Sequence, residues 1–305
     1  MEIQKSLSNK GRRQAVVGQE EGIPRGACEY QFQGIEHMER VIKSHMGLLD
    51  DENNKMKGKA RGATQDKFTS QFIVFSGVPS DVLEHKLAES SVIEKTFSSY
   101  HRPLKILVLK MVHLPHERAS RVFERLLENI LRSMGLEREL GLQGRAGVYG
   151  PQRDKEPDCS YSPRTLPAGR ANRWPSMVVE IADSEGQSQI EADARWWLEN
   201  SDGDVKIALT ISIQRTATRG IGIRRWEAID RPTRTNPHRR VAELMQEVNI
   251  VRQGDRSIAT TGAPLRLPFD RVMLRHPSTS VEADILILDE ELKVLGEEVW
   301  EVQGQ

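Results

Sequence analysis

Residues 176–182 read SMVVEIA, and the expected fold is built around this segment. A short, almost wholly apolar run is typical of a strand that is buried on both faces of a sheet. It nevertheless contains one acid, Glu180, and an isolated buried carboxylate is costly to ionise. Glu180 must therefore be paired, protonated or bound to a cation. Alternation of side chains along a strand places Val178, Glu180 and Ala182 on one face.

The segments around this strand alternate between helical and extended patterns. Before it, apolar residues recur at steps of three and four in HERASRVFERLLENILRSMG, and Gly135 follows as a natural stop. We further expect short strands at 137–143, at 147–149 and from 158, a helix at 187–200, strands at 205–213 and 222–226, a helix at 241–251 and a closing unit at 283–299. This order predicts an α/β (α+β) domain of three layers, in which helices flank a central mixed sheet.

A second acid precedes the Glu180 strand. Asp158 follows Pro157 and begins a short extended segment. If the two strands are neighbours, opposed side chains lie about 5 Å apart at Cβ, and two carboxylates at that spacing would hold one Mg²⁺ or Mn²⁺. Such an ion lowers the pKa of bound water and neutralises charge on a phosphodiester. The alternatives are a turn acid at Asp158 and a buried ion pair of Glu180 with an arginine such as Arg173 or Arg195.

A lysine in the next expected strand would complete this site. Residues 205–213 read VKIALTISI, and Lys206 alternates with Ala208, Thr210 and Ser212. Because this face carries small side chains, Lys206 would reach a cleft and position the attacking water. The alternative interpretation is a lysine that protects a strand edge against aggregation.

Four segments together carry a family resemblance. They are Pro157-Asp158 and residues 178–180 (VVE), 193–198 (DARWWL) and 205–207 (VKI). In this order they resemble the PD-(D/E)XK nuclease superfamily, and within it the Uma-type restriction-endonuclease-like proteins. The resemblance covers residues 115–230 and extends more loosely to 300. It implies a restriction-endonuclease-like fold, dependence on a divalent metal and hydrolysis of DNA phosphodiester bonds.

Carried over to the matching positions, the resemblance makes Asp158 and Glu180 the catalytic and metal-binding acids. The sequence departs from the family pattern where a lysine would follow, because residues 180–182 read EIA. Ala182 leaves room but supplies no charge. Lys206 is our substitute for the missing lysine, as the third catalytic residue.

Two polar side chains on the helix at 187–200 are candidates for a supporting role. Gln189 and Asp193 share one face of that helix at i, i+4 spacing. Asp193 would brace Lys206 or a metal-bound water. The alternative is that Asp193 is an ordinary acid on the helix surface.

A basic stretch follows the expected catalytic strands. Arginines predominate over acids between residues 215 and 240, and Arg219, Arg224 and Arg225 are our candidate phosphate-binding residues. Binding of DNA through such a patch would weaken steeply with salt. The alternative is a solvated loop of mixed charge.

Composition limits the class of protein. The chain has 305 residues with 44 Lys+Arg and 44 Asp+Glu, so its net charge is zero and any nucleic-acid surface must be local. Two distant cysteines, Cys28 and Cys159, form neither a disulfide framework nor a zinc cluster. No apolar stretch is long enough for a membrane span. We expect an intracellular protein, cytoplasmic or nuclear, with no membrane partner.

The amino-terminal part differs in composition from the rest. Residues 1–65 are rich in Gly, Gln and Lys with little periodicity, which predicts a mostly disordered tail in which a short helix near 35–49 is the alternative. Residues 66–300 are expected to form a single nuclease-like domain whose core lies at about 115–230.

Two functional hypotheses follow. In the first, Asp158 and Glu180 hold Mg²⁺ or Mn²⁺, Lys206 positions water, and the chain cuts DNA. In the second, the chain is a catalytically inactive interaction module on the same fold, with a protein partner or a second copy of itself. The missing lysine at Ala182 and the zero net charge motivate the second hypothesis.

Overall fold

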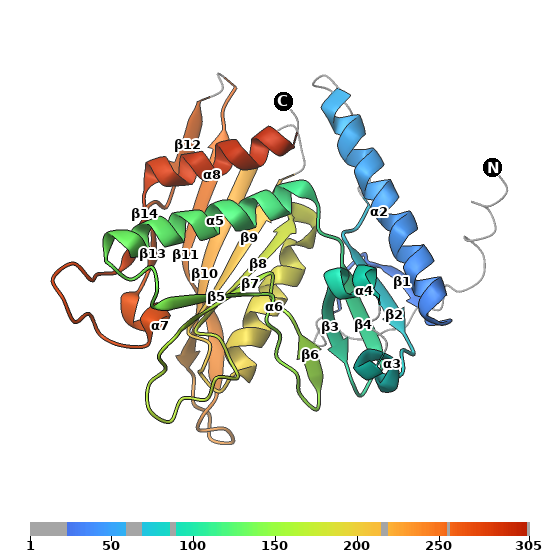
Figure 1. Ribbon diagram of the computed structural model, residues 1–305, viewed down its shortest axis with the longest axis horizontal. Helices are drawn as coiled ribbons and strands as arrows, with labels where there is room; N and C mark the ends of the chain where they lie inside the picture. The colour runs from blue at the N-terminus through green and yellow to red at the C-terminus, as the bar shows by residue number, and fades with distance from the viewer. Residues whose placement is uncertain (1–22, 59–68, 86–89, 215–218, 255–256, 304–305) are drawn as a thin grey trace.

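The computed structural model describes residues 23–58, 69–85, 90–214, 219–254 and 257–303. Within these residues the chain forms a seven-stranded sheet, a five-stranded sheet and a small two-stranded sheet. Figure 1 shows the larger sheet with its helices beside a smaller amino-terminal unit. The two units meet along one side of each sheet, and the candidate site lies there.

The seven-stranded sheet contains the SMVVEIA segment, most of which forms strand β8. Only β8 and β9 run parallel, because helix α6 carries the chain from one to the other, whereas the other neighbours are antiparallel. The strands in spatial order are β12 (Ile258–Thr261), β11 (Arg240–Arg252), β10 (Gly220–Asp230), β9 (Ile207–Ile213), β8 (Met177–Asp183), β7 (Cys159–Pro163) and β5 (Leu140–Gly144).

Helices cover both faces of this sheet. Helices α5 (Leu114–Ser133) and α8 (Asp289–Val302) pass over one face, and α6 (Gln187–Asn200), entered through the short 3-10 turn η3 (Ser184–Gly186), lies on the other (Figure 1). A mixed sheet between two helical layers is the three-layer α/β architecture predicted from the sequence, which is thereby confirmed.

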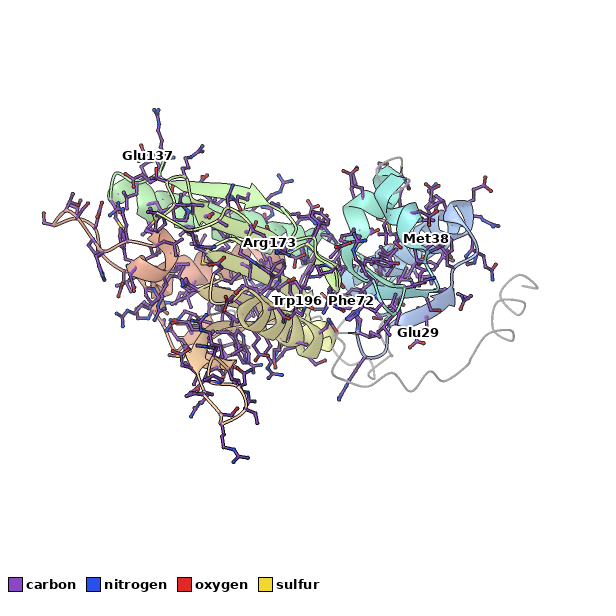
Figure 2. All side chains as sticks on the ribbon, turned by 90° about the horizontal axis from the view of Figure 1, so that it is seen from below. Glu29, Met38, Phe72, Glu137, Arg173 and Trp196 are labelled. Carbon is purple, nitrogen blue, oxygen red and sulfur yellow. The ribbon has the colours of Figure 1, made fainter. Side chains whose placement is uncertain are left out.

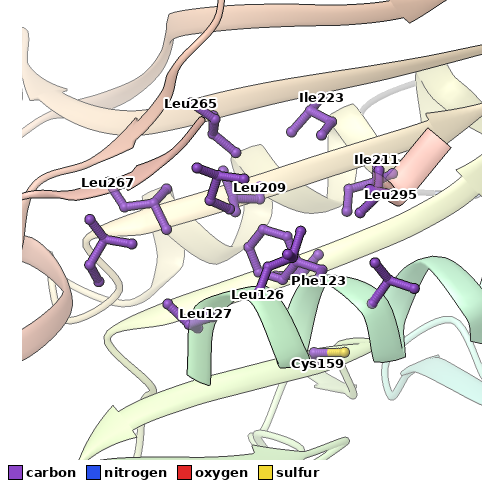
Figure 3. Close-up of a cluster of buried hydrophobic side chains, with 14 of the residues drawn as sticks. Phe123, Leu126, Leu127, Cys159, Leu209, Ile211, Ile223, Leu265, Leu267 and Leu295 are labelled. Atoms are coloured by element: carbon purple, nitrogen blue, oxygen red, sulfur yellow. The ribbon is translucent and has the colours of Figure 1, made fainter. Parts of the chain in front are cut away.

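The apolar stripe of α5 anchors the main core. Phe123, Leu126 and Leu127 are buried against Leu209 and Ile211 of β9 (Figure 3). Met177, Val179 and Ile181 of β8 point into the same core, so Glu180 points to the opposite face, towards α6, as alternation predicts.

A small annex closes the main core at its carboxyl-terminal end. It consists of the antiparallel strands β13 (Leu265–Leu267) and β14 (Ile285–Ile287) with helix α7 (Phe269–Met273). Its apolar residues join the cluster beneath α5.

The five-stranded sheet belongs to the amino-terminal unit. Its strands in spatial order are β1 (Cys28–Gln31), β2 (Phe72–Ser76), β4 (Ile106–Lys110), β3 (Phe97–His101) and β6 (Arg153–Lys155). Helix α2 (Ile35–Gly58) and the short helices α3 (Ser80–His85) and α4 (Ser91–Thr96) accompany it. Met38 and Ile42 of α2 are fully buried with Phe75, Leu107 and Leu109 in a second core.

The structure differs here from the disordered tail that we expected over residues 1–65. Residues 28–58 form β1 and α2, whereas 1–22 and 59–65 lie outside the described residues. The segment is polar overall because α2 exposes one face, and its few apolar residues were too sparse to indicate a core.

Strand β6 ties the two units together. It lies between β5 and β7 in the sequence, yet it pairs with β3 of the five-stranded sheet. The chain thus leaves the larger sheet, adds a strand to the smaller one and returns to Asp158, the residue before β7. The expected single domain over residues 66–300 therefore contains strands of two sheets.

Residues 241–251 form a strand, whereas we predicted a helix. Their apolar residues fit steps of three and four, but Leu244 and Met245 are exposed while Val248 and Ile250 alternate into the core. Pairing of β11 with β10 along its length satisfies the backbone and overrides the local preference. Among the described residues, no helix has the length and apolar character that crossing a bilayer requires.

Candidate functional site

The two predicted acids lie side by side. β7 pairs with β8 through Cys159↔Val179, and the same antiparallel register, continued by one residue, sets Asp158 opposite Glu180. The Nζ atom of Lys110 lies 2.5 Å from Asp158 Oδ2 and 3.8 Å from Glu180 Oε2. One lysine therefore bridges both carboxylates.

Lysine and arginine reach these acids from the five-stranded sheet. Lys110 ends β4 on the same face as Ile106 and Val108, which is the face opposite to α2. Arg153 and Lys155 share one face of β6 by the same alternation. The amino-terminal unit thus presents three cations to the larger sheet.

A third acid, on α6, completes the arrangement. Lys155 Nζ lies 2.8 Å from Asp193 Oδ1 and 3.5 Å from Glu180 Oε1. Arg153 lies 3.8 Å from the same oxygen of Asp193, which also accepts a hydrogen bond of 3.0 Å from Gln189 Nε2. Of the predicted supporting residues, Asp193 therefore contacts Lys155 near Glu180, and Gln189 contacts Asp193.

We call this set of six charged side chains the ion network. Its members are Lys110, Arg153, Lys155, Asp158, Glu180 and Asp193, and none has a side chain more than 5% exposed. All three cations come from the five-stranded sheet, and all three acids come from β8, α6 or the residue before β7. The interface between the two units is thus electrostatically complementary and balanced in formal charge.

Asp158 is held as a carboxylate. Its Oδ2 accepts hydrogen bonds from Lys110 Nζ and, at 2.7 Å, from the backbone N–H of Ile181, and His116 Nε2 lies 3.2 Å away. Burial by itself would raise the pKa of Asp158, but Lys110 and His116 bring that pKa well below its usual range. Burial lowers the pKa of His116, which favours its neutral form.

Glu180 has the opposite tendency. Its pKa is raised to about 7, mainly by burial. Lys155 lowers this pKa, whereas the charges of Asp193 and Asp158 raise it further. The indole Nε1 of Trp197 donates a hydrogen bond of 2.7 Å to Glu180 Oε1. The two neighbouring acids therefore differ strongly in proton affinity because Asp158 has the closer cation.

Aromatic side chains of α6 cover the network. Lys155 Nζ lies 5.7 Å from the ring centre of Trp197, and Arg153 lies 5.5 Å from that of Trp196. Trp196 and Phe72 lie where the two units meet (Figure 2). These rings help to keep water from the charged groups.

A second buried contact joins the two units next to the network. His113, at the start of α5, lies 2.6 Å from Asp183 Oδ1, and the backbone N–H of Asp183 donates to Gln71 Oε1 at 2.9 Å. Gln71 precedes β2 and Asp183 ends β8, so this contact fixes the edge of one sheet against the other.

The geometry does not fit a hydrated divalent ion. Mg²⁺ requires near-octahedral oxygen ligands at about 2.1 Å and usually retains several waters. Here ammonium groups already lie against Asp158 and Glu180, and both carboxylates are buried. Across the described part of the chain, no cluster of three or more His, Cys, Asp or Glu side chains is arranged to hold a metal.

Ala182, which stands where the family pattern has a lysine, is buried and closely surrounded. Ala182 is 1% exposed, and a Cβ built on Gly186 would lie 3.1 Å from both the Ala182 Cβ and the Phe72 ring. Phe72 belongs to β2 of the amino-terminal unit. Gly186 therefore lies between Ala182 and the amino-terminal unit, and little space is left around it.

The structure does not bring Lys206 to the acids, so our prediction that Lys206 takes the place of the missing lysine is wrong in its geometry. Lys206 shares a face with Thr210, the partner of Glu180, but precedes it by four residues, or about 13 Å along a strand. Its Nζ donates to the carbonyl oxygen of Gly203. The prediction gave the correct face of the strand for Lys206, but the distance along the strand excludes contact between Lys206 and Glu180.

The three predicted phosphate-binding arginines all contact protein acceptors. Arg219 donates to the Trp300 carbonyl oxygen, Arg224 pairs with Glu191 and Glu247, and Arg225 pairs with Glu227. Phosphate binding by these residues stays a prediction.

Sequence reasoning missed Lys110 and Lys155. Lys110 ends the apolar run ILVLK, and Lys155 lies three residues before Asp158. A lysine that ends a buried strand is a signal comparable to Glu180 itself, since both are charges in apolar surroundings. Which lysine faces which acid depends on the docking of two sheets and has no local signature.

Comparison with known proteins gives a weak structural likeness. No model of a known protein family matches the chain, and no curated protein matches it. A solved structure from Anabaena variabilis, described as a candidate nuclease belonging to DUF820, is 12% identical in sequence and superposes with a TM-score of 0.34. The match covers 66% of this chain and 90% of that one. This chain is thus weakly similar in structure to a nuclease-like protein of low sequence identity.

Proposed function

We propose that this protein is a non-catalytic interaction module built on a nuclease-like fold. One observation carries the proposal: the acids that a metal-dependent nuclease would use are buried and matched by Lys110, Arg153 and Lys155. The ion network would then hold the amino-terminal unit against the larger sheet, where an active nuclease would hold an ion and admit a phosphodiester.

Electrostatics supports this role. A divalent ion beside Asp158 would face the ammonium group of Lys110, so binding would require that lysine to leave. Buried ion pairs contribute little net stability, but breaking one leaves an uncompensated buried charge. The network would therefore specify one arrangement of the two units. A protein partner or a second copy of the chain is the binding partner that this hypothesis predicts.

A paired assay tests the proposal. Supercoiled plasmid is incubated with Mg²⁺ or Mn²⁺ and either the wild-type protein or the Asp158→Asn/Glu180→Gln variant, purified in parallel. Calorimetric titration of both proteins with each ion accompanies the assay. We expect no nicking above the level of the double variant and no heat of ion binding. Ion-dependent nicking by the wild type that the double variant lacks would contradict the proposal.

A metal-dependent nuclease is the second candidate, and one observation favours it. Asp158 and Glu180 are adjacent, and a lysine lies within 3.8 Å of both. If the wild type cuts DNA, Lys110→Ala should abolish cutting, whereas Lys206→Ala should leave it unchanged because Lys206 lies far along β9. Loss of cutting in Lys206→Ala alone would instead support Lys206 as the catalytic lysine, as predicted from the sequence.

A further inference from the structure

A two-stranded ribbon extends beyond the larger sheet. Pairing of β10 with β9 ends at Trp226↔Ala208, but pairing of β10 with β11 continues to Asp230↔Arg240. The loop between the strands is exposed throughout residues 231–239. We call residues 229–241 the basic arm; it projects from the body of the molecule in both overall views (Figure 1, Figure 2).

The arm carries a local positive charge on a protein of zero net charge. It contains Arg231, Arg234, Arg239 and Arg240 against the single acid Asp230. Arg231 pairs with Glu243 and Arg240 with Asp230, but these pairs are exposed and screened by solvent. Arg234 and Arg239 have no ion-pair partner within the described part of the chain.

The tip of the arm is ordered by its own hydrogen bonds. The backbone N–H of Arg231 donates to the Arg239 carbonyl oxygen at 2.8 Å, and that of Thr233 donates to the Asn236 carbonyl oxygen at 2.9 Å. The N–H of His238 donates to Asn236 Oδ1 at 3.2 Å. A loop that is already ordered loses less conformational entropy on binding, so binding through its arginines costs less free energy.

We infer that the basic arm inserts into the major groove of B-form DNA and binds it mainly through phosphates. That groove is about 12 Å wide and admits a two-stranded β-ribbon. Arginine is suited to phosphate because its planar guanidinium donates two parallel hydrogen bonds. The inference goes beyond the proposed function, since the arm shares no residue with the ion network and would bind DNA whether or not the network can cut it.

Fluorescence anisotropy with a labelled 20-base-pair DNA duplex tests the inference. Affinity is measured against salt for the wild type, for Arg234→Ala/Arg239→Ala and for the matched control Arg132→Ala/Arg138→Ala. The control removes two exposed arginines from the end of α5 and the loop after it, and so changes the net charge equally. The same titrations use a duplex RNA of equal length and polyglutamate.

We expect binding to DNA whose log affinity falls linearly with log salt. The arm variant should bind less tightly, and its salt slope should be shallower by about 0.9 for each phosphate that it no longer neutralises. The control should match the wild type. Equal weakening in both variants, RNA bound as tightly as DNA, or tighter binding of polyglutamate would each overturn the inference. Circular dichroism confirms that both variants remain folded.

Discussion

Lys110 and Asp158 are 48 residues apart in sequence and lie on different sheets, yet their side chains form a buried hydrogen-bonded ion pair of 2.5 Å. This contact determines the charge state and the surroundings of Asp158 in the candidate site. The acid that would bind a metal is neutralised by a lysine from the amino-terminal unit. Stability, proton binding and side-chain packing at the site should all depend on that unit.

Lys110→Ala should destabilise the fold strongly. Removing one partner of a buried ion pair leaves the other uncompensated, which costs about 3–5 kcal/mol. The free energy of unfolding by urea measures this. Lys43→Ala, in an exposed pair with Glu39 on α2, is the matched control and should change stability by less than about 1 kcal/mol. In a double-mutant cycle, Asp158→Asn should recover part of the loss from Lys110→Ala. Additive losses would show that the two residues are not coupled.

Glu180 should make stability fall as the pH rises from 4.5 to about 7. Its pKa is raised from the ordinary value of 4.5 to about 7, so between these values the folded state binds more protons than the unfolded state. This contribution is fully present below pH 4.5 and is lost by about pH 7. Chemical denaturation across this range should give a smaller pH dependence for Glu180→Gln than for the wild type. An unchanged slope would contradict the raised pKa.

Asp158 should act in the opposite direction. Its pKa is lowered by Lys110 and His116, so its contribution to stability is present at neutral pH and is lost as the pH falls through the unfolded pKa towards the folded one. Asp158→Asn should therefore lose stability at neutral pH and show a weaker dependence on acid than the wild type. Thermal melts between pH 2 and pH 5 check this; equal acid sensitivity of both proteins would refute it.

Ala182→Lys should not restore a nuclease site. Ala182 is buried beside Gly186, which also lies close to Phe72, and overfilling a packed site costs about 1–3 kcal/mol before the burial of charge is added. Thermal unfolding measures the loss. Combined with Phe72→Ala, the cost of Ala182→Lys should fall because the truncation opens space. A fully stable Ala182→Lys protein would show that the two units can separate at this point.

The two cysteines should differ in reactivity. Cys159 is buried with its Sγ 2.8 Å from Ser120 Oγ, and burial raises its pKa to about 11. Cys28 is partly exposed on β1. A thiol reagent at pH 8 should therefore modify Cys28 first, and Cys159 only when the protein unfolds. The Cys28→Ser variant should show no rapid phase; a rapid phase in that variant would place Cys159 within reach of solvent.

The larger sheet could be predicted from local patterns. Local patterns indicate which elements form and which of their side chains face the core, because side chains on one face recur every two residues in a strand and every 3.6 in a helix. Examples are the apolar stripe of α5, the apolar run of β8 and the alternation in VKIALTISI. Residues 241–251 were the exception, since their apolar spacing suits a helix as well as a strand. Only the presence of β10 alongside decides between them.

The sequence predicts that Asp158 and Glu180 are neighbours on the condition that their two strands pair, and the register that places them opposite each other comes from the structure. The sequence by itself determined that Glu180 needs a partner, because a lone buried carboxylate is costly to ionise. The tertiary structure was needed to show that Lys110 and Lys155 lie beside these acids and that Lys206 does not. The pairing requires the five-stranded sheet to dock beside the larger one, and contacts between distant strands leave no periodic signal in either segment.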